Sequence, residues 1–460
     1  MQLYPYQEAA VARIERERKV LLNFEMGLGK TPTAISAAKR TGSTRILIVC
    51  PAIVRQVWFE ELERWWPECP TRYLASSTKK MRAVPFEEDH ILITSYALLH
   101  QLPEQVNYDA IIFDESHYLK GSHNKPATRQ PRRLVAARRV VRTNKDRQSA
   151  LLLMLTGTPI DNEPLDVWAQ ADLLKKGQFG SKFGFKKRYC NEVISEYSLT
   201  GYTYEGLNPE RADELRQRLD RICIRVTKKE VAHLLPPLTV TPYRVPASRK
   251  DLKSLLEQLS RHDVHNTKIP PSLIRAHTDV KLKTVAELVT EARETGVTHI
   301  AVLTHLRQTA EDLAGILGGV CIHGEDTTQK RHQKLDAIQS SSGGVLVATM
   351  HSLTTGLSLT AFTEVIFAEL YWRPSTVSQA LARYHRVSGK EPVNVKMVIV
   401  EGTVEEQIAA RVQQRLEDSA KLIEAGNVES DLHGALEEDD EDFFAGLRRA
   451  ANAMEHEAYL

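Results

Sequence analysis

Short apolar runs alternate with amphipathic segments along most of the chain. Runs of about five or six residues rich in Ile, Leu and Val predict buried strands, and apolar residues at helical spacing between them predict helices. The strands expected in the first half are 45–50, 90–94, 110–114 and 151–156, and those in the second half are 299–304, 320–323, 345–349, 364–368 and 395–400. The helices expected are 52–66, 281–295, 307–317, 327–340, 374–387 and 403–425. This alternation predicts an α/β fold with parallel sheets.

The strands fall into two series of similar size, separated by a proline-marked stretch at 235–246. Clustered prolines of this kind indicate a connection between domains. We therefore expect two tandem α/β lobes, residues 1–235 and 236–425. An acidic tail at 426–460 follows them and is predicted to be mobile, and its run of acids at 437–442 is of low complexity.

The segment 25–31, Glu-Met-Gly-Leu-Gly-Lys-Thr, follows an apolar run at 20–22 and precedes a predicted helix at 32–39. A loop between a strand and a helix is the setting of a phosphate cradle. Backbone N–H groups around Gly27, Leu28 and Gly29 would close on phosphate oxygens, and Lys30 would add a full positive charge. Thr31 is placed to bind Mg²⁺ through its hydroxyl.

A second segment, Asp114-Glu115-Ser116-His117, ends the strand expected at 110–114. Its carboxylates would emerge at the carboxyl edge of a sheet, where α/β proteins bind ligands. Asp114 suits the Mg²⁺ site, and Glu115 suits orienting and deprotonating an attacking water. Phe24 stands where the strict phosphate-loop pattern requires glycine, and alone the two segments are compatible with a helix-entry loop and an exposed turn. Together, in this order, they predict a nucleotide hydrolase.

The second half carries Gln379, Arg383 and Arg386 in a helix expected to start after Pro374. Their spacing of i, i+4 and i+7 places them on one helix face. Two arginines and a glutamine aimed together can stabilise negative charge on a transferring phosphoryl group, as catalytic residues supplied by the second lobe. The alternative is a helix whose arginines pair with surface acids.

Composition excludes several classes of protein. The chain has 460 residues, of which 42% are hydrophobic and 26% charged, as in soluble globular proteins. No apolar run approaches the roughly 20 residues that span a bilayer, and the N-terminus lacks a signal-peptide profile. Five scattered cysteines without a C-x-x-C pair argue against a zinc module or a disulfide framework. We expect an intracellular, cytoplasmic protein, and the compact length suits a prokaryotic or viral source.

Charge is distributed unevenly. Residues 426–460 hold ten acids against two arginines, so the rest of this chain of net charge +2 is strongly basic. Residues 125–147 hold nine bases and one acid, and they include Arg132, Arg133, Arg138 and Arg139. A basic body predicts a polyanionic partner, which we take to be nucleic acid. A solvated helix face is the alternative for this basic segment.

Taken in order, the motifs resemble those of superfamily 2 helicase-like ATPases of the Swi/Snf branch, over about residues 3–415. In the first lobe the matching segments are Leu3–Gln7, Glu25–Thr31, Cys50-Pro51 with Trp58, Glu60 and Glu61, Ile93–Tyr96, Asp114–His117, Leu155–Ile160, and Val226–Val231 with Leu235-Pro236-Pro237. In the second lobe they are His323-Gly324, Thr354–Thr360, Trp372–Pro374 and Gln379–Arg386. The resemblance implies two tandem RecA-like lobes with ATP and Mg²⁺ bound in the cleft between them.

The resemblance also implies roles for individual residues. Gln7 would contact adenine, Gly356 would line the ATP site, and Thr156 and Thr158 would couple the nucleotide state to DNA. Lobes 1 and 2 would both hold the DNA backbone, with little sequence preference. The expected DNA contacts are Pro51, Ala52, Ser95, Tyr96, Thr304, His305 and Thr349, to which the basic segment adds Arg132, Arg133, Arg138 and Arg139.

Within the branch, Asp114–His117 and Phe183-Gly184 with Arg188-Tyr189-Cys190 resemble the compact HepA-related, annealing-helicase group. That resemblance implies a monomeric, DNA-stimulated ATPase that moves along double-stranded or forked DNA in repair or recombination. A strand-separating helicase acting on DNA or RNA is the alternative enzyme. An ATP-gated clamp without significant turnover is the alternative outside enzymes. Two departures from the branch are Phe24, where Asp is usual, and Val387-Ser388-Gly389, where Ile-Gly-Gln is usual.

Overall fold

The structure is a computed structural model that describes residues 2–103, 106–120, 131–144, 150–157, 159, 164–194, 202–246, 278–353, 358–371, 374–401, 405, 406 and 409. The chain divides into two compact units between Val231 and Ala232, called lobe 1 and lobe 2 below. Each lobe is described by itself. No helix within the described ranges combines the length and the apolar character that a membrane crossing requires.

Lobe 1 is built on a seven-stranded sheet in the order β3-β4-β2-β5-β6-β1-β9, with every neighbouring pair parallel. The strands are β1 (Lys19–Phe24), β2 (Arg45–Cys50), β3 (Thr71–Leu74), β4 (His90–Ser95), β5 (Ala110–Asp114), β6 (Leu151–Leu155) and β9 (Cys223–Val226). Since all run the same way, the segments that follow β1, β5 and β6 emerge at one edge of the sheet. That edge carries the phosphate loop and the acidic segment.

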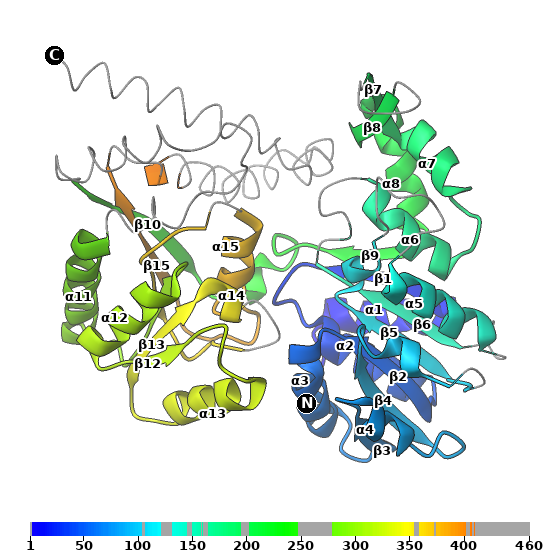
Figure 1. Cartoon of the computed structure of the whole chain (residues 1–460), viewed down its shortest axis with the longest axis horizontal. Helices are drawn as coiled ribbons and strands as arrows, with labels where there is room; N and C mark the ends of the chain where they lie inside the picture. Colours follow the sequence, from blue (N-terminus) through cyan, green and yellow to red (C-terminus); the bar gives the residue numbers. More distant parts are fainter. Residues whose placement is uncertain are drawn as a thin grey trace. The chain divides into compact units, whose positions relative to one another are not determined.

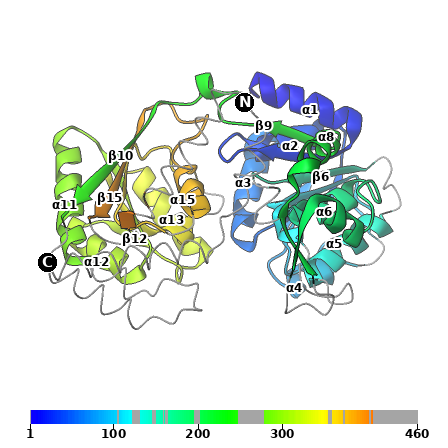
Figure 2. The same cartoon turned by 90° about the horizontal axis from the view of Figure 1, so that it is seen from above.

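Helices cover both faces of this sheet (Figures 1 and 2). On one face lie α1 (Pro5–Glu17), α2 (Lys30–Arg40) and α3 (Arg55–Trp65), and on the other lie α5 (Arg132–Thr143) and α6 (Leu165–Leu174). Alternate strand residues such as Leu47, Ile111 and Met154 pack in one core cluster with Leu134 of α5. Burial on both faces explains why these strands are continuous apolar runs.

A projecting part of lobe 1 follows α6. It consists of α7 (Lys182–Tyr189), the antiparallel hairpin β7 (Cys190–Ile194) and β8 (Tyr202–Leu207), and α8 (Ala212–Asp220). Figure 1 shows α7 and the hairpin extending beyond the sheet, at the upper right. The sequence pattern did not predict these two short strands.

Lobe 2 has a six-stranded sheet in the order β10-β15-β14-β11-β13-β12, again entirely parallel. Its strands are β10 (Leu238–Val245), β11 (His299–Thr304), β12 (Val320–Ile322), β13 (Gly344–Thr349), β14 (Glu364–Phe367) and β15 (Val393–Val400). Its helices are α11 (Thr278–Glu294), α12 (Arg307–Leu317), α13 (Thr328–Gln339), α14 (Met350–Leu353) and α15 (Pro374–Leu381). The prediction of two α/β lobes with parallel, helix-flanked sheets is confirmed.

Two predictions about elements are wrong. The proline-marked stretch is largely strand β10, which pairs with β15 along its whole length and includes Pro242. It is an edge strand and mostly exposed, and an edge strand tolerates proline because one side of its backbone has no strand partner. The helix expected at 374–387 ends at Leu381, so Arg383 and Arg386 lie beyond it.

Candidate nucleotide and nucleic-acid sites

The phosphate loop runs between β1 and α2. Gly27 and Gly29 adopt left-handed backbone conformations, with φ of 88° and 75°, and Gly29 is the N-cap of α2. A Cβ atom on Gly29 would lie 2.2 Å from Nε2 of Gln7. Both the conformation and the close approach therefore require glycine at this position.

Lys30 and Thr31 are the first two residues of α2, where the helix N-terminus faces the loop. The ammonium of Lys30 donates to the backbone oxygen of Phe24 at 2.9 Å, which closes the loop across its mouth. Thr31 is partly exposed, and Gly157 after β6 lies close enough that a Cβ there would sit 3.5 Å from Lys30 Nζ. The lysine therefore stands between the phosphate loop and the end of β6.

The structure shows what supports the loop in place of the usual aspartate. Phe24 is fully buried, and its ring lies 5.6 Å from that of Tyr6. The neighbouring Glu25 accepts a hydrogen bond from the backbone N–H of Lys228 at 2.9 Å. An aromatic contact and a carboxylate one position later therefore anchor the two sides of the loop.

Gln7 lies in the first turn of α1 and is 3% exposed. Its oxygen accepts from the backbone N–H of Tyr4 at 2.9 Å, and its amide donates to the backbone oxygen of Leu28 at 3.2 Å. The Tyr6 hydroxyl donates to the same oxygen at 2.9 Å. Leu28 itself is fully buried, so only its backbone can take part in phosphate binding. The start of α1 is thus tied directly to the loop.

Asp114 ends β5 and is held from three sides. The indole N–H of Trp58 donates to Oδ2 at 2.8 Å, and the backbone N–H of Glu115 donates to Oδ1 at 2.9 Å. The Tyr96 hydroxyl donates to the backbone oxygen of Asp114 at 2.7 Å. Burial, with the Glu115 carboxylate beside it, raises the pKa of Asp114 to about 6. A bound divalent cation would favour the ionised form.

Glu115 has a left-handed backbone, with φ of 50° and ψ of 52°, which is uncommon outside glycine. Such strain persists only where the surroundings over-determine it, and it is frequent at functional sites. Its Oε2 atom is buried and makes no hydrogen bond to any described residue. A buried carboxylate oxygen at this position can accept a hydrogen bond from a water. The oxygen donors of Thr31, Asp114 and Glu115 are those that Mg²⁺ prefers.

Side chains connect the acidic segment, residues 114–117, to the matched segment Leu155–Ile160 at the end of β6. His117 Nδ1 lies 3.4 Å from Glu115 Oε2 and 3.3 Å from the hydroxyl of Thr156, which is fully buried after β6. Ser116 donates to Gln170 of α6 at 2.6 Å, and Gln170 donates to the backbone oxygen of Pro159 at 3.0 Å. Two chains of contacts therefore join residues 115–117 to Thr156 and Pro159. Thr158 lies outside the described residues.

The DNA contacts expected in lobe 1 lie where β2 and β4, neighbours in the sheet, both end. Ala52 is exposed, whereas Pro51, Ser95 and Tyr96 are buried. The ring of Tyr96 stacks on the partly exposed Tyr118 at 5.6 Å. Tyr96 therefore links this edge to Asp114, and its hydroxyl is already committed there.

Of the basic segment 125–147, the structure describes residues 131–144, which include α5. The four arginines expected to contact DNA differ in their exposure and in their partners. Arg132 is exposed, and Arg133 lies over the ring of Tyr118 at 5.8 Å. Arg138 is 3.5 Å from Asp172 and lies 5.4 Å from the Trp168 ring, while Arg139 donates to the backbone oxygens of His100 and Leu102 at 3.2 and 2.9 Å. Arg138 and Arg139 therefore hold α5 against the rest of lobe 1.

In lobe 2, Thr304 and Thr349 are register partners at the ends of β11 and β13. Thr304 is fully buried and donates to the backbone oxygen of Leu306 at 3.0 Å. The buried carboxylate of Glu369 accepts from the backbone N–H groups of His305 and Leu306, both at 2.8 Å. Burial raises the pKa of Glu369. This carboxylate fixes the turn that follows β11.

The His305 ring lies 4.8 Å from Tyr371, which lies 4.7 Å from His351. Burial, with His351 nearby, lowers the pKa of His305 to about 4, so this imidazole is neutral at pH 7.

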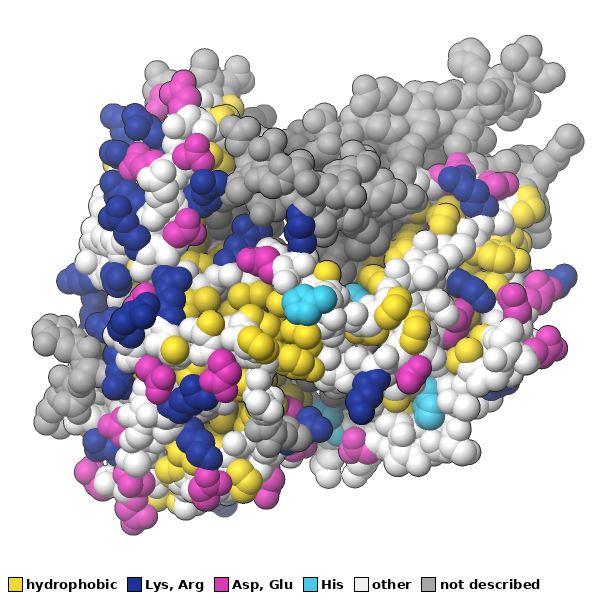
Figure 3. All heavy atoms as spheres, turned by 180° about the vertical axis from the view of Figure 1, so that it is seen from behind, with side chains coloured by type: hydrophobic (Ala, Val, Ile, Leu, Met, Phe, Trp, Pro, Cys, Tyr) yellow, Lys and Arg dark blue, Asp and Glu magenta, His cyan; other side chains and the backbone are white. Residues whose placement is uncertain are grey.

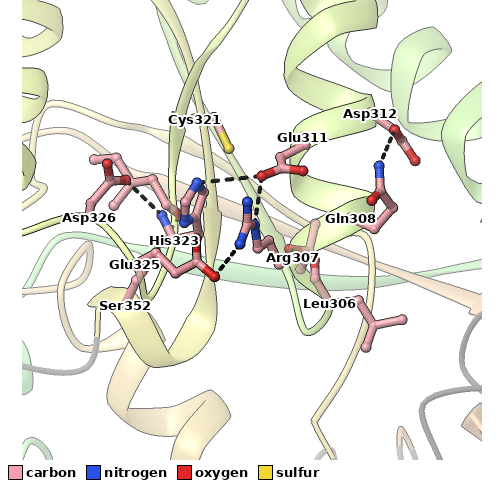
Figure 4. A network of polar contacts seen from close by, with 12 residues as sticks. Leu306, Arg307, Gln308, Glu311, Asp312, Cys321, His323, Glu325, Asp326 and Ser352 are labelled. Carbon is pink, nitrogen blue, oxygen red and sulfur yellow. Dashed lines mark hydrogen bonds and ion pairs between the residues drawn. The ribbon is translucent and has the colours of Figure 1, made fainter.

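Polar contacts also fix the turn after β12, which carries the His323-Gly324 motif (Figure 4). The backbone N–H of His323 donates to Asp326 at 3.2 Å, and Lys334 is 2.9 Å from the same carboxylate. Arg331 donates to the backbone oxygens of Gly324 at 2.9 Å and Ser352 at 3.4 Å. The turn is therefore joined to α13 and α14.

Gln379, Arg383 and Arg386, predicted to lie on one helix face, do not share one. Gln379 lies within α15, but beyond Leu381 the chain forms tight turns, with the N–H of Arg383 bonded to the oxygen of Ala380. The backbone oxygen of Arg383 accepts a hydrogen bond from the N–H of Leu359 at 3.0 Å. This bond takes the place of one that would continue the helix. Arg383 is 8% exposed and Arg386 is half-buried. Gly356 lies outside the described residues.

Several residues that hold the site were not assigned a role from sequence. Trp58 was matched only as part of a motif, and its bond to Asp114 crosses 56 positions of the chain. Lys228 was likewise only part of a matched segment, and Gln170 and Glu369 gave no signal in the sequence pattern. Each holds the site through hydrogen bonds to residues distant in the chain, which local periodicity cannot reveal.

Two parallel-sheet lobes, the first bearing a phosphate loop and an acidic segment at one sheet edge, define a helicase-like class of protein. Comparison with known families identifies it further: the SNF2-related domain matches residues 6–313, and the helicase conserved C-terminal domain matches residues 280–388. The chain belongs to the SNF2-related family. The predicted resemblance to the Swi/Snf branch is confirmed.

Individual relatives agree with this placement. The chain is 27% identical over 450 residues to the DNA annealing helicase and endonuclease ZRANB3 of Mus musculus, covering 90% of this chain and 40% of that protein. It is 28% identical over 467 residues to the SWI/SNF-related matrix-associated actin-dependent regulator of chromatin subfamily A-like protein 1 of Drosophila melanogaster, covering 94% and 58%. The chain thus spans about half the length of these relatives.

A solved structure, the Sulfolobus solfataricus SWI2/SNF2 ATPase core in complex with dsDNA, aligns over 95% of this chain and 97% of that one. Its sequence identity is 21% and its TM-score is 0.44.

Proposed function

We propose that this protein is a DNA-stimulated ATPase that moves along double-stranded or forked DNA inside the cell, acting as a monomer. The observation that carries the proposal is the site of lobe 1. A glycine-dependent phosphate loop, a lysine at its mouth and a strained acidic segment share one sheet edge. The chain's membership of the SNF2-related family supports it.

The residues of lobe 1, and three residues of lobe 2, have distinct roles in this proposal. Lys30 neutralises phosphate charge once it leaves the Phe24 oxygen, and Gln7 positions the base next to the loop. Thr31 and Asp114 would hold Mg²⁺, which supplies charge neutralisation at the phosphates. Glu115 orients the attacking water and accepts its proton. Arg383 and Arg386, with Gln379, stabilise charge on the transferring phosphoryl group.

DNA would be held through its phosphates at the sheet edges of both lobes, which makes binding tolerant of sequence and sensitive to salt. The His117–Thr156 and Ser116–Gln170 contacts would transmit the nucleotide state from Glu115 toward these edges. Alternating grip of the two lobes would then move the protein along one strand.

The test is the ATPase rate measured in parallel with no nucleic acid, single-stranded DNA, duplex DNA, forked DNA and RNA. We expect the largest stimulation with duplex or forked DNA. Strongest stimulation by RNA, or displacement of a labelled strand, would favour the alternative of a strand-separating helicase. A rate that stays at background on every nucleic acid, despite ATP binding, would favour a clamp.

A further inference from the structure

One motif of the sequence has no role in the site described above. It is Phe183-Gly184 with Arg188-Tyr189-Cys190, carried by α7 and the start of β7. Tyr189 and Cys190 are 1% and 3% exposed, so packing in the core explains them. Phe183 is 67% exposed, the largest exposure of any large hydrophobic side chain among the described residues. Core packing does not explain this phenylalanine.

The ring of Phe183 is supported without being covered. It meets the ring of Tyr204, on strand β8, edge to face with centroids 6.4 Å apart. The Tyr204 hydroxyl donates to Glu192 of β7 at 2.9 Å, which fixes the supporting ring on the hairpin. Beneath them Phe185 is fully buried, 4.8 Å from Tyr189, so α7 is firmly seated. The exposed ring is therefore held on a rigid base.

The chain on both sides of Phe183 is basic. Residues 175–189 contain six bases and no acid, namely Lys175, Lys176, Lys182, Lys186, Lys187 and Arg188. Arg188 is neutralised by Glu214 at 2.9 Å, but Lys175, Lys176 and Lys187 are exposed and pair with no acid in the described part of the chain. Figure 3 shows Lys and Arg side chains gathered along the projecting part of lobe 1, at the upper left, with acidic ones among them.

We propose that Phe183 and the lysines around it form a binding surface for single-stranded nucleic acid. A base would stack on the exposed ring, and neighbouring phosphates would lie against the lysines. This combination of an aromatic platform and basic side chains is how proteins bind single strands without sequence preference. In a duplex the faces of the bases are covered by their neighbours, so the ring selects an unpaired strand. The inference deepens the proposed function by adding the single-stranded arm of a fork as a ligand of lobe 1.

The test uses the full chain and fluorescence anisotropy with a labelled 20-residue oligo(dT), which has no secondary structure, and with a mixed-sequence 20-base-pair duplex. Phe183→Ala should weaken oligo(dT) binding about tenfold and leave duplex binding within about twofold, because one stacked base is lost. Phe183→Trp should retain the affinity. Ile316→Ala is the matched control, since this side chain on α12 of lobe 2 is 56% exposed and should not change oligo(dT) binding.

The charge component is tested separately. Replacing Lys175, Lys176 and Lys187 together by Gln should flatten the salt dependence of oligo(dT) binding, by a log–log slope of roughly 0.7 for each lost phosphate contact. Because all these side chains are exposed, thermal unfolding should be unchanged in every variant. An unchanged salt slope would overturn the role of the lysines.

Other outcomes overturn the inference. The inference is wrong if Phe183→Ala binds oligo(dT) as tightly as the unchanged protein does. It is also wrong if Phe183→Ala loses as much affinity for the duplex as for oligo(dT). A labelled peptide of residues 434–447, acidic and bearing Phe443 and Phe444, tests the other occupant of such a surface. If Phe183→Ala weakens binding of that peptide and leaves oligo(dT) affinity unchanged, the surface binds the acidic C-terminal tail instead of nucleic acid. Failure of DNA to stimulate the ATPase would reject the proposed function. The effect of Phe183→Ala on oligo(dT) affinity would still decide whether this surface binds single strands.

Discussion

At the scale of single residues, the phosphate loop and the acidic segment show how little freedom the site leaves. Gly29 cannot carry a side chain, because a Cβ atom would meet Gln7 at 2.2 Å. Glu115 is held in a left-handed conformation, and its Oε2 atom is buried without a hydrogen bond to the described residues. Substitutions of Lys30 and of Glu115 in this site should therefore distinguish ATP binding from ATP hydrolysis.

Glu115→Gln should keep ATP affinity and lower the turnover rate by about 10²–10⁴, since the amide cannot accept the proton of the water. Lys30→Ala should instead weaken ATP binding, because the countercharge of the phosphates is lost. Fluorescent-nucleotide binding and steady-state ATPase rates measure the two effects. A Glu115→Gln protein with a normal rate would show that another group is the base.

Trp58→Phe should raise the Mg²⁺ concentration needed for half-maximal ATPase. The change removes the indole N–H that bonds Asp114 Oδ2 at 2.8 Å and leaves a buried carboxylate oxygen without its donor. Trp168→Phe is the control, since the indole of Trp168 donates to the backbone oxygen of Gly180 at 3.2 Å instead. An equal Mg²⁺ dependence in the two variants would contradict a positioning role for Trp58.

At the scale of elements, the arginines of helix α5 fall into two groups that the sequence presented as one basic segment. Arg138 and Arg139 contact Asp172, Trp168 and backbone oxygens of lobe 1, whereas Arg132 and Arg142 are exposed. The exposed pair can meet DNA phosphates, and the inner pair attaches the helix.

Arg132→Gln with Arg142→Gln should weaken DNA binding about equally on unrelated sequences and flatten its salt dependence, by a slope of roughly 0.9 for each lost duplex phosphate contact. Its melting temperature should not change. Arg139→Gln, by contrast, should lower stability, because two backbone oxygens lose their donor. If the salt slope of the first variant is that of the original protein, α5 is a solvated face.

At the scale of the whole molecule, catalysis should need both lobes. Arg383→Ala and Arg386→Ala should each lower the catalytic rate far more than ATP affinity, and a protein of residues 1–235 should be almost inactive even when folded. Arginines that complete a phosphoryl-transfer site contribute roughly 10³–10⁵ in rate. Rates and circular dichroism of the fragment provide the check. Full ATPase activity of folded lobe 1 alone would show that Arg383 and Arg386 are not needed for catalysis.

The acidic tail at 426–460 lies outside the described residues, and two roles are predicted for it: solubility, or competition with DNA for the basic body. Deletion of residues 427–460 should raise DNA affinity and DNA-independent ATPase, and the effect should shrink at high salt, because exposed charges are screened beyond roughly 10 Å at 0.1 M. Identical affinity and basal rate at low salt, with and without the tail, would leave solubility as its role.

Local pattern was sufficient for much of the fold. Strands β2, β5 and β11 and helix α12 have the predicted bounds, because a continuous apolar run or a helical stripe reports burial directly. The motifs in series also predicted the family. Pattern failed at β10, since a proline-bearing edge strand has the same local sequence as a connection, and at α15, where Leu359 takes the oxygen of Arg383.

The sequence by itself determined two α/β lobes, a phosphate loop, an acidic segment and membership of the Swi/Snf branch, because each depends on residues close together in the chain. Only the tertiary structure decided that Trp58 and Tyr96 hold Asp114, that His117 reaches Thr156, and that Arg139 is bound inward while Phe183 is exposed. These contacts join strands and helices that are distant in sequence. A hydrogen bond or an exposed ring of that kind depends on where the sheet places both partners, which no local spacing of residues encodes.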